Sequence, residues 1–269
     1  MAAYIRVRNV VLDVPYFEQP QRDARNWLGT LVSAATAVPK RRFARLLDGV
    51  SFDLEEGDRV VMLGRNGAGK TTLLRVMTGA FQPTSGHIEV SGTRQALLNL
   101  SLGFNQEATV HENIFLRATA MGIDASLIKG MVGEVLAFAE LGDIQNRRLL
   151  TLSAGQRMRL GFAISTIVQH DIMLLDEWFG AGDFGFVKKA RERLVDRVTG
   201  SKIVVVASHN MELARRLCNR GIVLHQGKLE FSGPVAESIK FYKNLVDESK
   251  RRKALESENA AGDVSVPTA

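Results

Sequence analysis

Hydrophobic and polar residues alternate with different periods along the chain, and these periods divide it into strands and helices. Residues 4–13 and 50–54 alternate apolar with polar side chains, as strands with one buried face do. Unbroken apolar runs bounded by turn residues predict the buried strands of a parallel sheet, at 59–63, 172–176, 202–206 and 222–224. Residues from about 109 to 165 show helical spacing instead. The pattern predicts a doubly wound α/β core carrying an inserted helical lobe.

Two stretches do not fit this alternation. An insertion at about 20–47 combines the apolar run 27–32 with the basic run Lys40-Arg41-Arg42 and Arg45. It predicts either an amphipathic, membrane-facing element or a surface helix packed on its own domain. The polar stretch 247–269 is expected to be a disordered tail, which leaves 1–246 as the folded domain.

A glycine-rich segment directly behind the strand 59–63 carries the clearest chemistry. It matches the pattern G-x-x-x-x-G-K-[ST], whose backbone N–H groups surround phosphate oxygens. Lys70 is expected to reach the β- and γ-phosphates, and the Thr71 hydroxyl is expected to ligate Mg²⁺. The nucleotide-binding residues predicted here are Gly64, Arg65, Asn66, Gly67, Ala68, Gly69, Lys70, Thr71 and Thr72.

Further polar residues lie at strand and helix ends, where they meet ligands in α/β proteins. The run 172–176 ends at Asp176, and Glu177 follows directly. Asp176 suits a Mg²⁺ shell, whereas Glu177 suits the polarisation of an attacking water. His209 follows the run 202–206 and is predicted to contact the γ-phosphate, although a histidine at such a position is usually structural. Ser153, Gly155 and Gln156 open a predicted helix, whose first turn offers free N–H groups to an anion.

Composition adds limits to this picture. The 269 residues carry a formal net charge of +6 and a pI near 9.6, which favours an anionic partner such as nucleic acid, a phospholipid surface or a nucleotide. A single cysteine, Cys218, excludes an intrachain disulfide and indicates a reducing compartment. No stretch reaches the roughly 18–20 apolar residues of a membrane span.

The ordered set of motifs resembles the ATP-binding cassette (ABC) ATPases across nearly the whole chain. The resemblance implies a P-loop core with a parallel sheet, an antiparallel β subdomain, and an inserted helical subdomain at about 100–168. It implies ATP and Mg²⁺ as cofactors, with Lys70, Glu177 and His209 as the catalytic residues. It also implies a homodimer with composite sites, in which Ser153, Gly155 and Gln156 of one copy face the nucleotide of the other and Asp183 communicates between them.

Two family roles have several candidates or an atypical setting. The aromatic residue that stacks on adenine is assigned to Tyr16, with Phe17 and a purely structural role as alternatives. The metal-contacting glutamine is assigned to Gln106, beside Thr71 and Asp176, although its loop is shorter than in most members. The family's signature motif is resembled by Leu152-Ser153-Ala154-Gly155-Gln156, which also departs from the usual pattern, because Ala154 replaces the usual first glycine.

The segment from Gly103 to Asn113, the run after Glu177 and Ser208-His209-Asn210 are similar to the ATPases of bacterial polysaccharide exporters. This resemblance implies export of a lipid-linked O-antigen, capsular polysaccharide or teichoic acid. The implied partners are the lipid-linked substrate and a separate transmembrane permease, at the cytoplasmic face of the inner membrane, and no nucleic acid is expected. Two other classes stay open: a soluble cassette ATPase that acts on nucleic acid or ribosomes, and a non-hydrolysing regulatory module.

Overall fold

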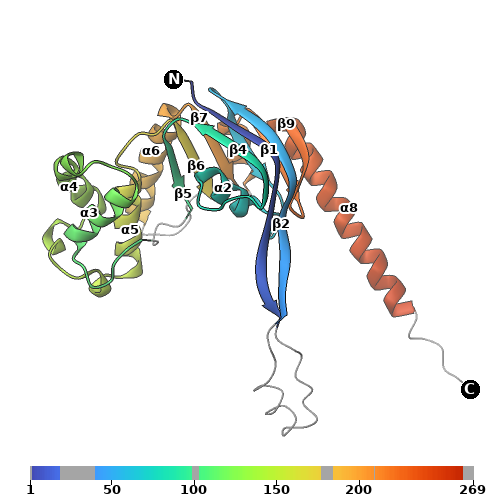
Figure 1. Cartoon of the computed structure of the whole chain (residues 1–269), viewed down its shortest axis with the longest axis horizontal. Helices are drawn as coiled ribbons and strands as arrows, with labels where there is room; N and C mark the ends of the chain where they lie inside the picture. Colours follow the sequence, from blue (N-terminus) through green and yellow to red (C-terminus); the bar gives the residue numbers. More distant parts are fainter. Residues whose placement is uncertain (1, 19–39, 99–102, 177–183, 209, 263–269) are drawn as a thin grey trace, which may run out of the picture.

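Two β-sheets and a group of helices build the chain, which a computed structural model describes over residues 2–18, 40–98, 103–176, 184–208 and 210–262 (Figure 1). In this described part, one sheet has the strand order β2-β1-β4 and the other has the order β5-β6-β7-β3-β8-β9. The strands of the six-stranded sheet are β3 (Arg59–Leu63), β5 (Arg94–Leu97), β6 (Ile172–Asp176), β7 (Ile203–Ala207), β8 (Arg220–His225) and β9 (Lys228–Pro234).

The six-stranded sheet is the predicted parallel core. Neighbours from β5 to β8 pair in parallel, and only β9 runs antiparallel, to β8. Its inner strands are almost entirely buried, because layers of side chains cover both faces. The helices α2 (Lys70–Thr78), α6 (Phe184–Gly200), α7 (Met211–Leu217) and α8 (Val235–Gly262) complete these layers. The parallel order brings the carboxyl ends of β3, β6 and β7 to one edge.

The three-stranded sheet contains a long hairpin, β1 (Tyr4–Glu18) with β2 (Lys40–Glu55), and the strand β4 (Ser85–Ser91). Strand β4 pairs with β1 only between Tyr4 and Val11, where the apolar side chains are buried. Beyond that point the hairpin continues alone and projects from the body (Figure 1). The expectation of a surface helix is therefore wrong for residues 40–47, which form strand; the rest of the insertion, 19–39, lies outside the described residues.

A helical lobe lies at one end of the molecule and contains α3 (Val110–Ala120), α4 (Ala125–Ala139) and α5 (Ala154–Ser165), with two 3₁₀ turns, η1 (Gly142–Ile144) and η2 (Leu149–Thr151) (Figure 1). Thr109 caps α3 in a capping box with Glu112. Phe138 of α4, Phe162 of α5 and Phe186 of α6 pack together, with ring centroids 5.6–6.0 Å apart. This aromatic cluster joins the lobe to the core.

The last helix, α8, runs to Gly262 and extends away from the body (Figure 1). Its first half packs Ile239 and Tyr242 against Val61 and Leu63 of β3. The prediction of disorder from residue 247 is therefore wrong up to residue 262, and residues 263–269 lie outside the described part. The segment contains few apolar side chains but many Ala, Glu, Lys and Arg residues, which are strong helix formers. Across the described residues, no helix is both long and apolar enough to cross a membrane.

Candidate nucleotide site

A glycine-rich loop joins β3 to α2, and two of its glycines are required by close packing. A Cβ atom on Gly64 would lie 2.6 Å from the Leu224 carbonyl oxygen, a distance that real Cβ atoms do not tolerate. Gly69, the residue before α2, has φ 103°, a left-handed conformation that favours glycine. These glycines let the chain turn from strand to helix within six residues. The turn exposes the amino end of α2, where free N–H groups attract phosphate.

Lys70 reaches back across this loop. Its Nζ donates hydrogen bonds to the carbonyl oxygens of Gly64, at 2.6 Å, and Arg65, at 3.2 Å. The side chain is buried apart from the cavity it lines, since only 9% of its surface is exposed. A buried ammonium group at the mouth of a phosphate loop supplies the counter-charge that a triphosphate needs.

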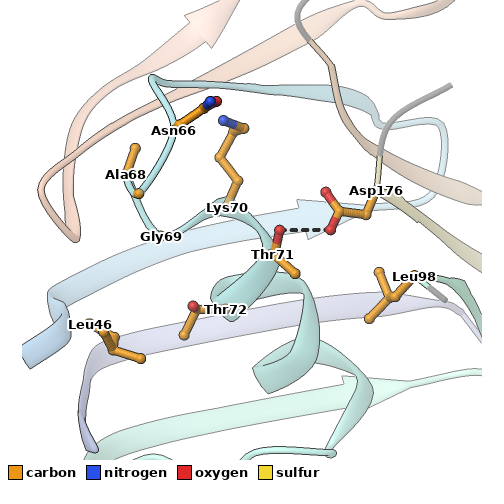
Figure 2. Close-up of a pocket in the computed structure, with 10 residues that line it drawn as sticks. Leu46, Asn66, Ala68, Gly69, Lys70, Thr71, Thr72, Leu98 and Asp176 are labelled. Carbon is orange, nitrogen blue, oxygen red and sulfur yellow. Dashed lines mark hydrogen bonds between the residues drawn. The ribbon is translucent and has the colours of Figure 1, made fainter. Parts of the chain in front are cut away.

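Thr71 and Asp176 come together from elements that are 105 positions apart. The Thr71 hydroxyl donates a 2.6 Å hydrogen bond to Asp176 Oδ2 (Figure 2). A hydroxyl and a carboxylate are hard oxygen ligands, and Mg²⁺ in nucleotide sites uses few protein ligands beside phosphate oxygens and water. The pair therefore fits a Mg²⁺ ion held together with a nucleotide phosphate.

The loop, α2 and the end of β6 surround a cavity of about 560 Å³ (Figure 2). Most of its lining was predicted from the sequence, from Asn66 to Thr72 together with Asp176. Leu46 of β2 and Leu98, which follows β5, also line it and were not predicted. Both are apolar residues without a motif, so only the folded chain reveals them.

Three predicted binding residues lie away from this cavity. The Arg65 guanidinium donates a 2.9 Å hydrogen bond to Ser249 Oγ of α8, so the side chain of this loop residue points to the last helix. Tyr16 lies on the projecting hairpin, opposite Arg42, and 44% of the Tyr16 surface is exposed. The alternative residue, Phe17, is 67% exposed. Gln106 is exposed in the loop before α3, where its carbonyl accepts a hydrogen bond from Leu150. None of the three lines the cavity.

The start of α5 forms a second, separate surface. Ser153 caps the helix, its hydroxyl accepting from the Gln156 N–H at 3.2 Å while its own N–H donates to Gln156 Oε1 at 2.9 Å. Ser153 and Gly155 are exposed, and neither lines the cavity. Within one chain, the predicted signature residues and the phosphate loop thus do not meet.

Glu177, Asp183 and His209 lie outside the described residues, and their roles stay predictions. Their described neighbours are placed as expected. Asp176 pairs with Ala207 across β6 and β7, so these two strands end at the same edge of the sheet. Ser208, which directly follows β7, is buried.

The sheet order, the glycine-rich turn and the Thr71–Asp176 pair together define a P-loop nucleoside triphosphatase. The family profile "ABC transporter" matches residues 47–180. The chain is 37% identical over 224 residues to the O-antigen export system ATP-binding protein RfbE of Yersinia enterocolitica, a match that covers 82% of this chain and 93% of that protein. The chain therefore belongs to the ABC transporter family, as an ATPase whose hydrolysis of ATP is coupled to transport.

Two further likenesses agree with this family. The chain is 33% identical over 196 residues to the teichoic acids export ATP-binding protein TagH of Bacillus anthracis, covering 73% of this chain but only 36% of that protein. A solved dimeric, post-hydrolysis structure of an ATP-binding cassette with ADP and Pi shares the fold, with a TM-score of 0.62 at 20% identity over 86% of this chain and 98% of that one. The predicted fold class is confirmed.

Proposed function

We propose that the chain powers export of a lipid-linked polysaccharide, of O-antigen, capsule or teichoic acid type, through a separate membrane subunit. The observation that carries the proposal is the phosphate cavity with Lys70, Thr71 and Asp176 in a chain that is 37% identical to RfbE along 93% of that protein's length. The site supports ATP binding with Mg²⁺, and the relative's name supplies the substrate class. The chain would act as a peripheral protein at the cytoplasmic face of the bacterial inner membrane.

The exposed start of α5 supports action as a pair. The exposed first turn of α5, with the Ser153 hydroxyl and the Gly155 N–H, offers donors to an anion, yet the cavity of the same chain does not include these residues. A second copy, turned head to tail, would place its Ser153 opposite the phosphates held by Lys70. Each ATP would then lie between two chains, and hydrolysis would separate them.

A groove of about 620 Å³ on the helical lobe supports the contact with the membrane subunit. This α3 groove is lined by Asn105, Glu107, Ala108, His111, Glu112, Phe115 and Leu116. Its surface is mainly apolar, Leu116 is 49% exposed, and the two carboxylates lie beside it. A short amphipathic segment with a basic residue fits this chemistry.

A deletion strain tests the function. Loss of the chain should abolish surface polysaccharide and leave its lipid-linked precursor inside the cell, because synthesis continues while export stops. Complementation with the unchanged chain or with an Arg191→Lys control, at an exposed position of α6, should restore the surface polysaccharide. Complementation with Lys70→Ala should not.

One result would replace the proposal. Normal surface polysaccharide in the deletion strain, together with salt-sensitive binding of duplex nucleic acid by the purified chain, would favour the cassette ATPases that act on nucleic acid or ribosomes. The net charge of +6 makes that comparison worth including.

A further inference from the structure

The loop from 103 to 109, between β5 and α3, is held by a buried asparagine. Asn113 has no exposed surface, and its Oδ1 accepts from the Asn105 N–H at 2.8 Å. Its Nδ2 lies 2.8–3.2 Å from three backbone carbonyl oxygens, those of Asn105, Ala108 and Thr109. One side chain thus satisfies polar groups along the loop, because its amide carries a donor and an acceptor side by side.

One turn further along α3, Arg117 contacts the same loop. Its guanidinium lies 4.8 Å from the centroid of the Phe104 ring, and Nη2 donates to Ser165 Oγ at 3.1 Å. Only 8% of the residue is exposed, and this burial lowers its pKa to about 10, so the group stays charged at neutral pH. Ser165 ends α5, the helix that Ser153 begins. Arg117 therefore contacts both the loop and the far end of the signature helix.

The loop in turn holds the segment that leads into Ser153. The Leu149 N–H donates to the Ala108 carbonyl at 2.9 Å, and the Leu150 N–H donates to the Gln106 carbonyl at 3.0 Å. These two residues begin η2, which ends at Thr151, two positions before Ser153. The path from Asn113 to Ser153 thus begins with hydrogen bonds from the Asn113 side chain to the loop backbone and continues with backbone hydrogen bonds from the loop to η2, so the position of the loop sets the position of the cap.

We propose that Asn113 and Arg117 are positioning residues for the composite ATP site: they fix loop 103–109, and through it they orient Ser153 toward the nucleotide of a second copy. The inference rests on the proposed function, because Ser153 does not line the phosphate cavity of its own chain and is expected to act in that of a second copy. Neither residue lines the phosphate cavity, so their effect should fall on pairing and turnover and should spare the binding of ATP by a single chain.

The test uses the full chain with Glu177→Gln, which is expected to bind ATP without hydrolysing it. Arg117→Lys keeps the charge but loses the planar group over Phe104, and Asn113→Ser keeps a polar group too short to reach both loop ends. Each should weaken ATP-dependent pairing about tenfold, the effect of one to two buried hydrogen bonds. Each should also speed amide hydrogen exchange at 149–156 about tenfold, with ATP affinity of the single chain, measured by calorimetry below the pairing concentration, within about twofold. The exposed Arg191→Lys change should alter none of these quantities.

The possible outcomes distinguish failure of the positioning role of Asn113 and Arg117 from failure of the proposed paired action. Parent-level exchange and pairing in both variants would overturn the inference, and so would a parallel loss of ATP affinity and melting temperature, since that pattern describes damage to the whole fold. If the Glu177→Gln parent itself stays monomeric with ATP, the proposal of paired action fails. Exchange at 149–156 in the two variants then still decides whether they position Ser153.

Discussion

Lys70 connects the geometry of the phosphate loop to its charge. Its Nζ touches two loop carbonyls and stands beside the cavity, so a phosphate entering the loop exchanges neutral acceptors for charged ones. We expect Lys70→Ala to raise the dissociation constant for ATP roughly 10- to 100-fold, as loss of a charge-assisted hydrogen bond does. Calorimetry with ATP and Mg²⁺ measures the change, and Lys129→Ala on the exposed surface of α4 serves as the control. Equal affinities in the two variants would contradict the assigned role.

Glu177 is predicted to act on water instead of phosphate. Glu177→Gln should bind ATP with the affinity of the unchanged chain, because the loop, Lys70 and the Thr71–Asp176 pair stay intact. Hydrolysis should fall by a factor of at least about 100, the usual scale for removing a positioned general base. A rate within about threefold of the unchanged chain, in a phosphate-release assay, would exclude Glu177 as the principal base.

For single residues, the sequence predicts the functional site well where the functional residues are consecutive in the chain. Nine consecutive residues specify the phosphate loop, and the structure builds the cavity from most of them. Leu46 of β2 and Leu98, which follows β5, also line this cavity. Neither belongs to a motif that would have predicted an apolar lining residue. The direction of Arg65 was also beyond prediction, since its partner Ser249 is 184 positions away on α8.

Among the elements, the projecting β1–β2 hairpin exposes aromatic and basic side chains. Phe17 and Phe43 are 67% and 59% exposed, and the Arg41 guanidinium lies 5.1 Å from the Phe43 ring centroid. Arg42 and Arg45 instead form ion pairs with acidic residues of the same hairpin. Arg41 and Phe43 are therefore the residues whose exchange disturbs the hairpin least.

We expect Arg41→Glu combined with Phe43→Ser to leave the ATPase rate of the isolated chain unchanged and to reduce polysaccharide export severalfold. The reason is that an exposed aromatic and cationic surface favours a membrane or a membrane protein, whereas both residues lie away from the phosphate cavity. Surface polysaccharide in the complemented deletion strain gives the measurement, with Lys129→Glu as a charge-matched control. Normal export would leave the hairpin without a transport role.

Two elements differ from their prediction for physical reasons. Residues 40–47 pair with β1 across a gap of more than twenty residues, and their basic side chains hide the period of two that marks a strand. The tail was assigned to disorder from its low hydrophobicity, yet helix propensity and the packing of Ile239 and Tyr242 upstream extend α8 to Gly262. Strands β3, β6, β7 and β8 were predictable, because burial on both faces leaves an unmistakable apolar run.

For the whole molecule, the separation of the phosphate cavity from the start of α5 determines what a lone chain lacks. The cavity lies at the edge of the parallel sheet, and Ser153 and Gly155 lie on the helical lobe. A side chain at Gly155 has room within its own chain, since an added Cβ atom would meet nothing closer than Ser153 Oγ at 3.9 Å. An acidic residue in the first turn of α5 also suits the helix dipole. The Gly155→Asp variant should therefore fold normally, and the new side chain should affect only a molecule that faces residue 155.

This separation makes the chain suitable for interallelic complementation. Lys70→Ala chains alone and Gly155→Asp chains alone should both be inactive, because every ATP site of each homodimer contains a defect. Co-expression of the two alleles should recover hydrolysis, since the mixed dimer assembles one site from an unaltered Lys70 and an unaltered Gly155. A single allele bearing both changes, mixed with the unaltered chain, should leave no mixed dimer with an intact site. Failure of the two single alleles to rescue one another would mean that each ATP is processed by one chain alone. The phenotype of a strain with both alleles would then depend on the single chains and not on the dimers that they form.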